Sequence, residues 1–196
     1  MHKGERLILG SQLSTVNGRS GRPDILVRVG AKKNSEGKWE YLPVDVKFHS
    51  ALDGSAKPKE WNVGSIDDPW WESRILTEVG EGTPHKNDSL QLAHYWQMLS
   101  DLGHAGSTDP LGGIFDREGI LLWRQLDEPM WKHPDPITQE TKQRSALEIS
   151  NLEWSFRWRA ISIVLKQKSE QRLTEPILHG NCAQCTWSNV CYDELD

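Results

Sequence analysis

Asp45 and Lys47 stand one residue apart in the segment YLPVDVKFHS, Tyr41 to Ser50. The segment is rich in branched and aromatic residues, which predicts a β-strand. Side chains alternate between the two faces of a strand, so Asp45 and Lys47 share one face, whereas the other is lined by Val44, Val46 and Phe48. The pattern predicts a core face and a charged face. An ordinary solvated charged face is the alternative interpretation of an isolated D-x-K pair.

Asp24 begins the preceding apolar segment, PDILVRV at Pro23 to Val29, and a polar turn at 32–38 joins this segment to the D-x-K strand. The two segments therefore predict a hairpin. A turn centred between Ser35 and Glu36 places Asp24 opposite Lys47 and Val27 opposite Val44. Directly opposed residues have Cβ atoms roughly 5 Å apart, so we expect Asp24, Asp45 and Lys47 to converge.

Gln91 and Tyr95 lie on a predicted helix that begins at Asn87 or Asp88 and stops at Gly103. Its apolar stripe consists of Leu92, Trp96 and Leu99. Gln91 and Tyr95 are four residues apart and therefore share one helix face, at the margin of the buried side.

Cys182, Cys185 and Cys191 are the only cysteines, and all three lie in the last 15 residues. An odd, clustered set with C-x2-C-x5-C spacing indicates a metal site rather than a disulfide framework. His179 stands three residues before Cys182, so the residues alone allow a Cys3His zinc site.

The remaining elements complete an α/β pattern. We expect a strand at 6–13, a long loop at 49–84, two strands in GGIFD and ILLWRQL, a Pro-rich linker at 127–136 and a helical stretch from Gln139 to Arg172. Residues 1–175 then form one domain, and residues 176–196 form a cysteine-rich tail packed on it.

The order of these motifs resembles that of the PD-(D/E)xK nucleases. GRPDILV, VDVK, QLAHY and the three cysteines follow one another as in the RecB-type exonuclease domains, including the iron–sulfur branch shared with the CRISPR-adaptation exonucleases. The resemblance spans Gly21 to Cys191. It implies a restriction-endonuclease-like core with a mixed central sheet flanked by helices.

The resemblance also implies hydrolysis of phosphodiester bonds in DNA, in single strands or at ends. Asp24 and Asp45 are hard oxygen ligands suited to Mg²⁺ or Mn²⁺, with the Val46 carbonyl as a third ligand. Lys47 would orient or deprotonate the attacking water or hold the phosphate. Gln91 and Tyr95 would contact the substrate backbone or brace the metal site.

For the cysteines the resemblance implies a [4Fe–4S] cluster with a fourth cysteine upstream of the first motif. No cysteine and only His2 lie upstream here, so we expect a chain truncated at its N-terminus. We expect the cluster in a longer parent protein, which would include or bind a helicase-like region. Zinc would be the occupant in this chain.

Composition leaves two function classes open. The net charge of -5 provides no global attraction to nucleic acid, so binding depends on a local site or on bound cations. No apolar run has the length of a signal peptide or of the roughly 20 residues in a membrane span, so we expect a cytoplasmic protein. The two classes are a metal-dependent nuclease and a non-catalytic nucleic-acid-binding or scaffold module derived from one.

Overall fold

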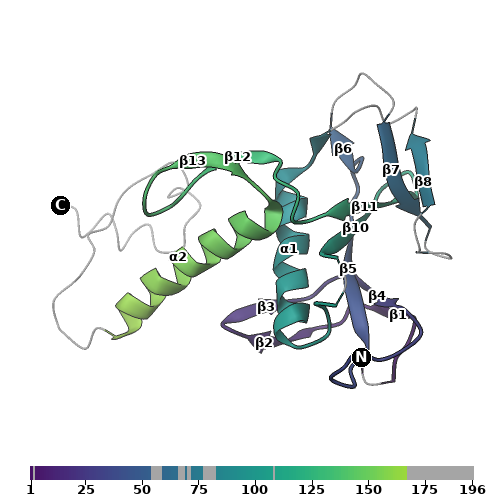
Figure 1. The fold of residues 1–196 in the computed structure, drawn as a ribbon, viewed down its shortest axis with the longest axis horizontal. Helices are drawn as coiled ribbons and strands as arrows, with labels where there is room; N and C mark the ends of the chain where they lie inside the picture. Colours follow the sequence, from purple (N-terminus) through teal and green to yellow (C-terminus); the bar gives the residue numbers. More distant parts are fainter. Residues whose placement is uncertain are drawn as a thin grey trace, which may run out of the picture. The chain divides into compact units, whose positions relative to one another are not determined.

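The computed structural model describes residues 1, 3–53, 59–65, 69, 72–76, 83–107 and 109–166. It confirms a mixed α/β architecture with a mixed central sheet and two helices (Figure 1). The sheet has seven strands, in the spatial order β1 (Leu7–Leu9), β4 (Ile25–Val29), β5 (Glu40–Val46), β10 (Leu111–Phe115), β11 (Leu121–Gln125), β7 (Lys59–Gly64) and β8 (Glu72–Leu76).

Strand β5 runs parallel to β10 and antiparallel to β4, whereas every other neighbouring pair in this sheet is antiparallel. A parallel pair requires a crossover, and helix α1 (Lys86–Asp101) lies on the connection between β5 and β10. The helix packs against both strands (Figure 1). It thereby faces the end of β5 that carries Asp45.

Both sides of β4 and β5 are buried, because apolar residues cover each of them. Leu26 and Tyr41 pack with Met98 and Leu99 of α1 on one side. The opposite side packs in a second cluster, which includes Val27, Leu42, Val44, Leu121 and Trp123. Asp45 is on the α1 side, where it is only 3% exposed.

The prediction that Val46 and Phe48 join Val44 on a core face is wrong. Strand β5 ends at Val46, which is 41% exposed, and Phe48 beyond it is 96% exposed. The backbone bends after the strand, so the alternation of faces does not extend to Phe48.

The predicted register of the β4–β5 hairpin is also wrong, by two residues. Ile25 pairs with Val44 and Val27 with Leu42. The turn is centred on Asn34, whose side-chain Oδ1 accepts hydrogen bonds from the backbone N–H groups of Glu36 and Lys38. A shift of two residues leaves every side chain on its predicted face, so Asp24 and Asp45 still share a side of the sheet.

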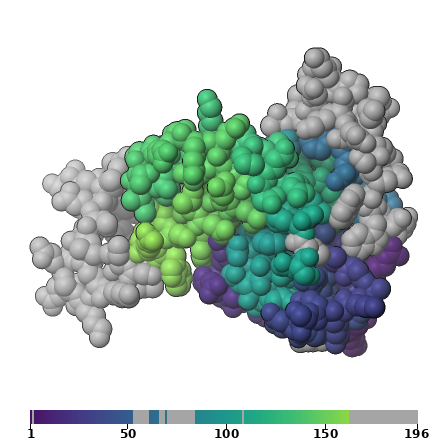
Figure 2. Space-filling model, in the orientation of Figure 1, coloured from purple at the N-terminus to yellow at the C-terminus, as the bar shows by residue number. Residues whose placement is uncertain are grey.

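The hairpin loop is attached to the carboxyl end of α1. Asn34 donates a hydrogen bond to the Gly103 carbonyl at 3.1 Å, and Lys38 donates one to the Leu102 carbonyl at 2.9 Å. In Figure 2 the dark blue residues of this region lie directly beside the teal residues of α1. These contacts hold the β4–β5 hairpin and α1 together at the end remote from Asp45.

Helix α1 has the predicted apolar stripe, with Leu92 and Leu99 fully buried and Trp96 packed against three core clusters. Its N-cap is His85 rather than Asn87 or Asp88. Asp88 lies in the first helical turn and is 7% exposed, so it belongs to the protein interior and not to a capping position.

The described residues of the segment 49–84, which was predicted as a long loop, form four strands. Besides β7 and β8, these are β6 (Leu52–Asp53) and β9 (Thr83–Pro84), which pair with each other. Strand β7 extends the central sheet by pairing with β11. Another two-stranded ladder joins β2 (Leu13–Val16) to β3 (Arg19–Gly21), so the predicted single strand at 6–13 is divided.

Parts of the linker predicted at 127–136 and of the helix predicted from Gln139 onwards are β-strands. They are β12 (Trp131–Pro134) and β13 (Thr141–Arg144), which pair with each other in a third two-stranded ladder. Helix α2 (Ala146–Lys166) begins after it. Ser145 and Glu148 form a reciprocal capping box, with the Glu148 N–H donating to Ser145 Oγ and the Ser145 N–H donating to Glu148 Oε2. The S-x-x-E signal in the sequence was overlooked.

The chain divides into two compact units, Met1–Phe156 and Arg157–Asp196, with the division inside α2. The predicted boundary at residue 175 and the cysteine-rich tail lie outside the described residues. In the described part of the chain, neither helix combines the length and apolar character that a membrane span requires.

Candidate active site

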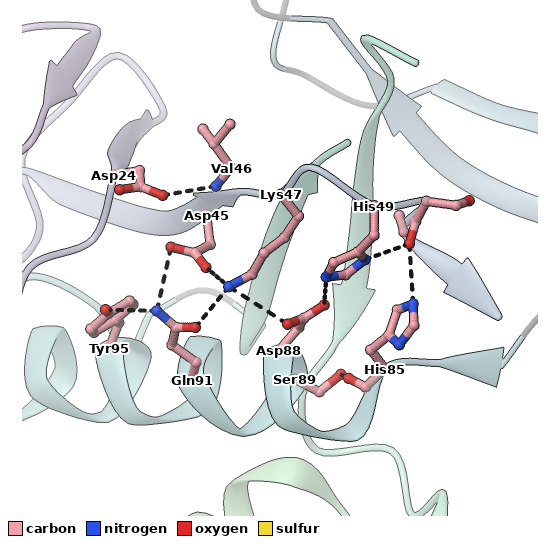
Figure 3. Close-up of polar contacts among 12 residues, drawn as sticks. Asp24, Asp45, Val46, Lys47, His49, His85, Asp88, Ser89, Gln91 and Tyr95 are labelled. Carbon is pink, nitrogen blue, oxygen red and sulfur yellow. Dashed lines mark hydrogen bonds and ion pairs between the residues drawn. The ribbon is translucent and has the colours of Figure 1, made fainter. Parts of the chain in front are cut away.

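The candidate site lies at the carboxyl end of β5 and faces the first turns of α1 (Figure 3). Asp24 directly precedes β4 and reaches across to β5, where its Oδ2 accepts a hydrogen bond from the Val46 N–H at 2.9 Å. This bond fixes the Asp24 carboxylate beside Asp45. The structure therefore brings the two predicted carboxylates together.

Lys47 follows β5 immediately, and its ammonium group lies among three side chains. Its Nζ atom is 2.5 Å from Asp45 Oδ2 and 3.6 Å from Asp88 Oδ1. It also donates a hydrogen bond to Gln91 Oε1 at 3.0 Å. Two close contacts, to Asp45 and Gln91, and a longer ion pair with Asp88 therefore hold the Lys47 ammonium group in place.

Gln91 and Tyr95 extend this network along α1. The Gln91 amide Nε2 donates to Tyr95 Oη at 3.0 Å and to Asp45 Oδ1 at 3.5 Å. The Tyr95 ring is packed against Gly21 of β3, where an added Cβ would lie 2.6 Å from Tyr95 Cε1. All five predicted side chains are thus in one contact network, and Gly21 provides the space for one of them.

Burial governs the charge of Asp45. Burial, together with the neighbouring Asp24, raises the pKa of the Asp45 carboxyl group to about 6, against the opposing effect of Lys47. For Lys47, burial lowers the pKa, but Asp45 and Asp88 outweigh it and the net pKa is raised. At neutral pH the site therefore holds an ammonium ion next to the Asp45 carboxylate, which burial and the neighbouring Asp24 destabilise.

Sequence reasoning missed Asp88 and His49. His49 Nε2 lies 3.5 Å from Asp88 Oδ2, so Asp88 stands between Lys47 and His49 (Figure 3). A spacing signal existed for Asp88, which is three residues before Gln91 on one helix face. None existed for His49, because the backbone bends after β5 and the strand alternation ends before this residue.

Two histidines anchor the chain that leaves β5 to the start of α1. His49 Nδ1 and His85 Nε2 donate to the same acceptor, the Ser50 carbonyl oxygen, at 2.8 and 3.1 Å. Their rings meet edge to face with centroids 4.4 Å apart. These contacts keep Lys47 close to α1.

A divalent cation fits the donor set in part. Asp24 and Asp45 supply two carboxylates whose mutual repulsion a cation would relieve, and Mg²⁺ is commonly held by one or two carboxylates plus water. In the part of the chain that the structure describes, no three His, Cys, Asp or Glu side chains form a metal-binding group. Any cation here would therefore need backbone or water ligands as well.

The second predicted metal site, formed by Cys182, Cys185 and Cys191 with or without His179, lies outside the described residues. Comparisons of the chain with protein-family models, with curated proteins and with solved structures find no match.

Proposed function

We propose that the protein is a metal-dependent nuclease that hydrolyses phosphodiester bonds of DNA, in single strands or at ends. One observation carries this proposal: Asp24, Asp45 and Lys47 converge at the end of β5, with Lys47 Nζ 2.5 Å from Asp45 Oδ2. Their order in the sequence and their positions at the start of β4 and at the end of β5 agree with the PD-(D/E)xK resemblance. The mixed sheet with a helix against β5 and β10 is compatible with the restriction-endonuclease-like core which that resemblance implies.

Asp24, Asp45 and the Val46 carbonyl would hold Mg²⁺ or Mn²⁺. Such a cation, when bound, lowers the pKa of a water ligand and neutralises charge on the phosphate. Asp24 is already oriented by its bond to the Val46 N–H, so its position requires no rearrangement of the backbone. Asp45 must be ionised to act as a ligand.

Lys47 would bind a phosphoryl oxygen as an ammonium ion. Its raised pKa supports this role over that of a general base, because a base must release its proton near neutral pH. Gln91 and Asp88 hold the ammonium in place, and an ammonium positioned before the reaction stabilises developing negative charge efficiently. The Tyr95 hydroxyl, which accepts from Gln91, would donate to the substrate backbone, and Gln91 would brace the site.

The second candidate function is a non-catalytic nucleic-acid-binding or scaffold module. Two observations favour it. Asp24 Oδ2 and Asp45 Oδ2 already have partners within the chain, namely the Val46 N–H and Lys47. The described residues also lack a cluster of three metal-binding side chains. This candidate predicts salt-sensitive DNA binding without cleavage.

Cleavage of labelled single-stranded and double-stranded DNA with Mg²⁺ or Mn²⁺ tests the proposal. Asp45→Asn and Lys47→Met keep the side-chain size and should abolish cleavage. Glu36→Gln, on the exposed hairpin loop, removes one carboxylate remote from the site and should cleave like wild type. Equal cleavage by all four proteins would assign the activity to a contaminant. Binding without any cleavage would favour the second candidate.

The C-terminal cysteines would bind a structural [4Fe–4S] cluster, or zinc with His179 as the fourth ligand. The C-x2-C-x5-C spacing supports this proposal, because a turn between the first two thiolates directs both towards one ion. Anaerobic purification followed by iron and zinc analysis separates the two metals. A metal-free protein with the same melting temperature as its Cys185→Ser variant would contradict both.

A further inference from the structure

Arg22 is an exposed cation in the motif GRPDILV, at the margin of the candidate site. The chain from Gly21 to Asp24 passes along this site. At its start, Gly21 packs against the Tyr95 ring. At its end, the Asp24 carboxylate accepts a hydrogen bond from the Val46 N–H. Arg22 stands between these two contacts, so its side chain leaves the backbone next to groups that the site uses.

Gly10 holds the Arg22 side chain near the backbone of Asp24. The Arg22 Nε–H donates to the Gly10 carbonyl at 3.0 Å, and the Gly10 N–H donates to the Asp24 carbonyl at 2.7 Å. Gly10 has a φ of +57°, and an added Cβ would lie 3.2 Å from Arg22 Nη2. Glycine therefore suits this position because it adopts the left-handed conformation without strain and because it leaves space for the guanidinium group.

The two Nη groups of Arg22 remain available for a ligand. Neither of them has a hydrogen-bond or ion-pair partner among the described residues. Lys47 differs in this respect, because its ammonium group is already paired with Asp45 and Asp88. Arg22 thus supplies positive charge outside any ion pair of the described residues, in a protein whose net charge is -5. Such a local cation is what an acidic protein needs to attract a polyanion.

The chemistry of the free groups favours a phosphate ligand. The planar guanidinium directs parallel N–H groups at two oxygens of one anion, and this geometry matches phosphate. Because Arg22 is exposed, the phosphate need not be enclosed by protein. This suits the backbone of a strand that passes over the surface, where most protein contacts to nucleic acid are made with phosphate and sugar.

We infer that Arg22 binds a non-reacting backbone phosphate of single-stranded DNA. The inference rests on the proposed function in one respect: the strand is the one whose scissile phosphate lies at Lys47. Arg22 is then a substrate-binding residue that fixes the path of the strand across the site. A contact to the phosphate backbone carries no sequence information, so Arg22 strengthens the binding of all sequences equally.

Binding of labelled single-stranded DNA to the full chain, measured by fluorescence anisotropy in EDTA, tests the inference without cleavage. The logarithm of the wild-type binding constant should fall linearly with the logarithm of the salt concentration. Arg22→Gln should make this slope less steep by about 0.7, because one phosphate contact is lost. The change should be the same for oligonucleotides of different base sequence. Arg22→Lys keeps the charge and should keep most of the slope, but it should bind more weakly because the bidentate contact is lost.

The matched control is Lys33→Gln, which also removes one exposed cation, from the hairpin loop at the end remote from Asp45. It should keep the wild-type slope. An unchanged slope in Arg22→Gln, an equal change in Lys33→Gln, or no salt-dependent binding by wild type would overturn the inference. If wild type does not cleave DNA with Mg²⁺ but Arg22→Gln still reduces the slope, the proposed hydrolysis fails and the inference stands.

Discussion

Lys47 Nζ donates a hydrogen bond to Gln91 Oε1 at 3.0 Å, and this bond determines the direction of the Gln91 amide. An ammonium group can only donate, so the carbonyl end must face Lys47. The amide nitrogen then faces Asp45 and Tyr95. Gln91 is therefore a positioning residue for both charged members of the site.

Gln91→Glu should impair the site although the side chain keeps its length. The introduced carboxylate would still accept from Lys47, but it could not donate to Asp45, and as an additional carboxylate it would raise the pKa of Asp45 further. We expect cleavage to fall by roughly 10- to 100-fold, which corresponds to about 1.4 to 2.8 kcal/mol. Gln97→Glu, on the same helix and bonded to Asp101, is the matched control and should cleave normally.

Replacing Gly21 by alanine should displace the Tyr95 ring, because the added Cβ would lie 2.6 Å from Tyr95 Cε1. Overpacking of this kind costs about 1–3 kcal/mol. Urea unfolding of the variant measures the loss. The double variant Gly21→Ala/Tyr95→Leu should lose less stability than the sum of the single variants, and strict additivity would show that the two residues do not compete for space.

Asp88→Asn should destabilise the protein and loosen Lys47. Asp88 is buried and lies 3.6 Å from Lys47 Nζ. It also opposes the burial that lowers the pKa of Arg124 to about 10, so its loss leaves the half-buried Lys47 and the buried Arg124 less well compensated. We expect a loss of about 1–3 kcal/mol in the free energy of unfolding. Asp101→Asn, at the exposed end of the same helix, should change stability much less. A similar loss in both variants would contradict a special role for Asp88.

The raised pKa of Asp45 predicts a pH dependence of stability in the absence of metal. The folded protein binds a proton with a pKa of about 6 and the unfolded chain with one near 3.8, so ionisation opposes folding between these values. The contribution of Asp45 to the free energy of unfolding is therefore largest below pH 4, and it is lost as the pH rises to 6. The variant Asp45→Asn has no carboxyl group at this position, so its stability does not decrease in this way. The stability of the variant relative to wild type should therefore increase from pH 4 to pH 7, by no more than about 3 kcal/mol. Urea unfolding in EDTA measures the difference, and a constant difference would contradict the shift.

His94 should produce the opposite dependence, at a place away from Asp45. Arg19 donates to His94 Nδ1 at 2.9 Å, so the neutral ring carries its proton on Nε2, which donates to the Ser20 carbonyl at 3.1 Å. Burial lowers the pKa of His94, and Arg19 lowers it further. The neutral His94 ring contributes fully to the free energy of unfolding above pH 6.5, the pKa of histidine in the unfolded chain. This contribution is lost as the pH falls below that value. Between pH 7.5 and 5, the melting temperature of wild type should fall more than that of His94→Gln. An equal fall in both proteins would exclude this role.

Much of the candidate site follows from local periodicity in the sequence. Alternation along a strand places Asp45 and Lys47 on one side, and a spacing of four places Gln91 and Tyr95 on one helix face. Both relations depend only on backbone geometry, and the structure has both. The same reasoning applied to Asp88 would have found it, since it stands three residues before Gln91 on the same helix face. His49 lies beyond the bend after β5, where strand alternation no longer applies.

The features that sequence reasoning missed depend on contacts between distant segments. The register of β4 and β5 is set by the Asn34 turn and its attachment to the end of α1, which no period in the strands encodes. Strand β7 is a short part of a segment without a sustained period, and it joins the central sheet by pairing with β11, some sixty residues later. Arg124, a charged residue in a core strand, is stabilised by Ser89 and Ala51 from other elements. Periodicity thus defines which side chains share a face, whereas tertiary packing selects the partners of each face, because partner choice depends on the fit of surfaces that are far apart in the chain.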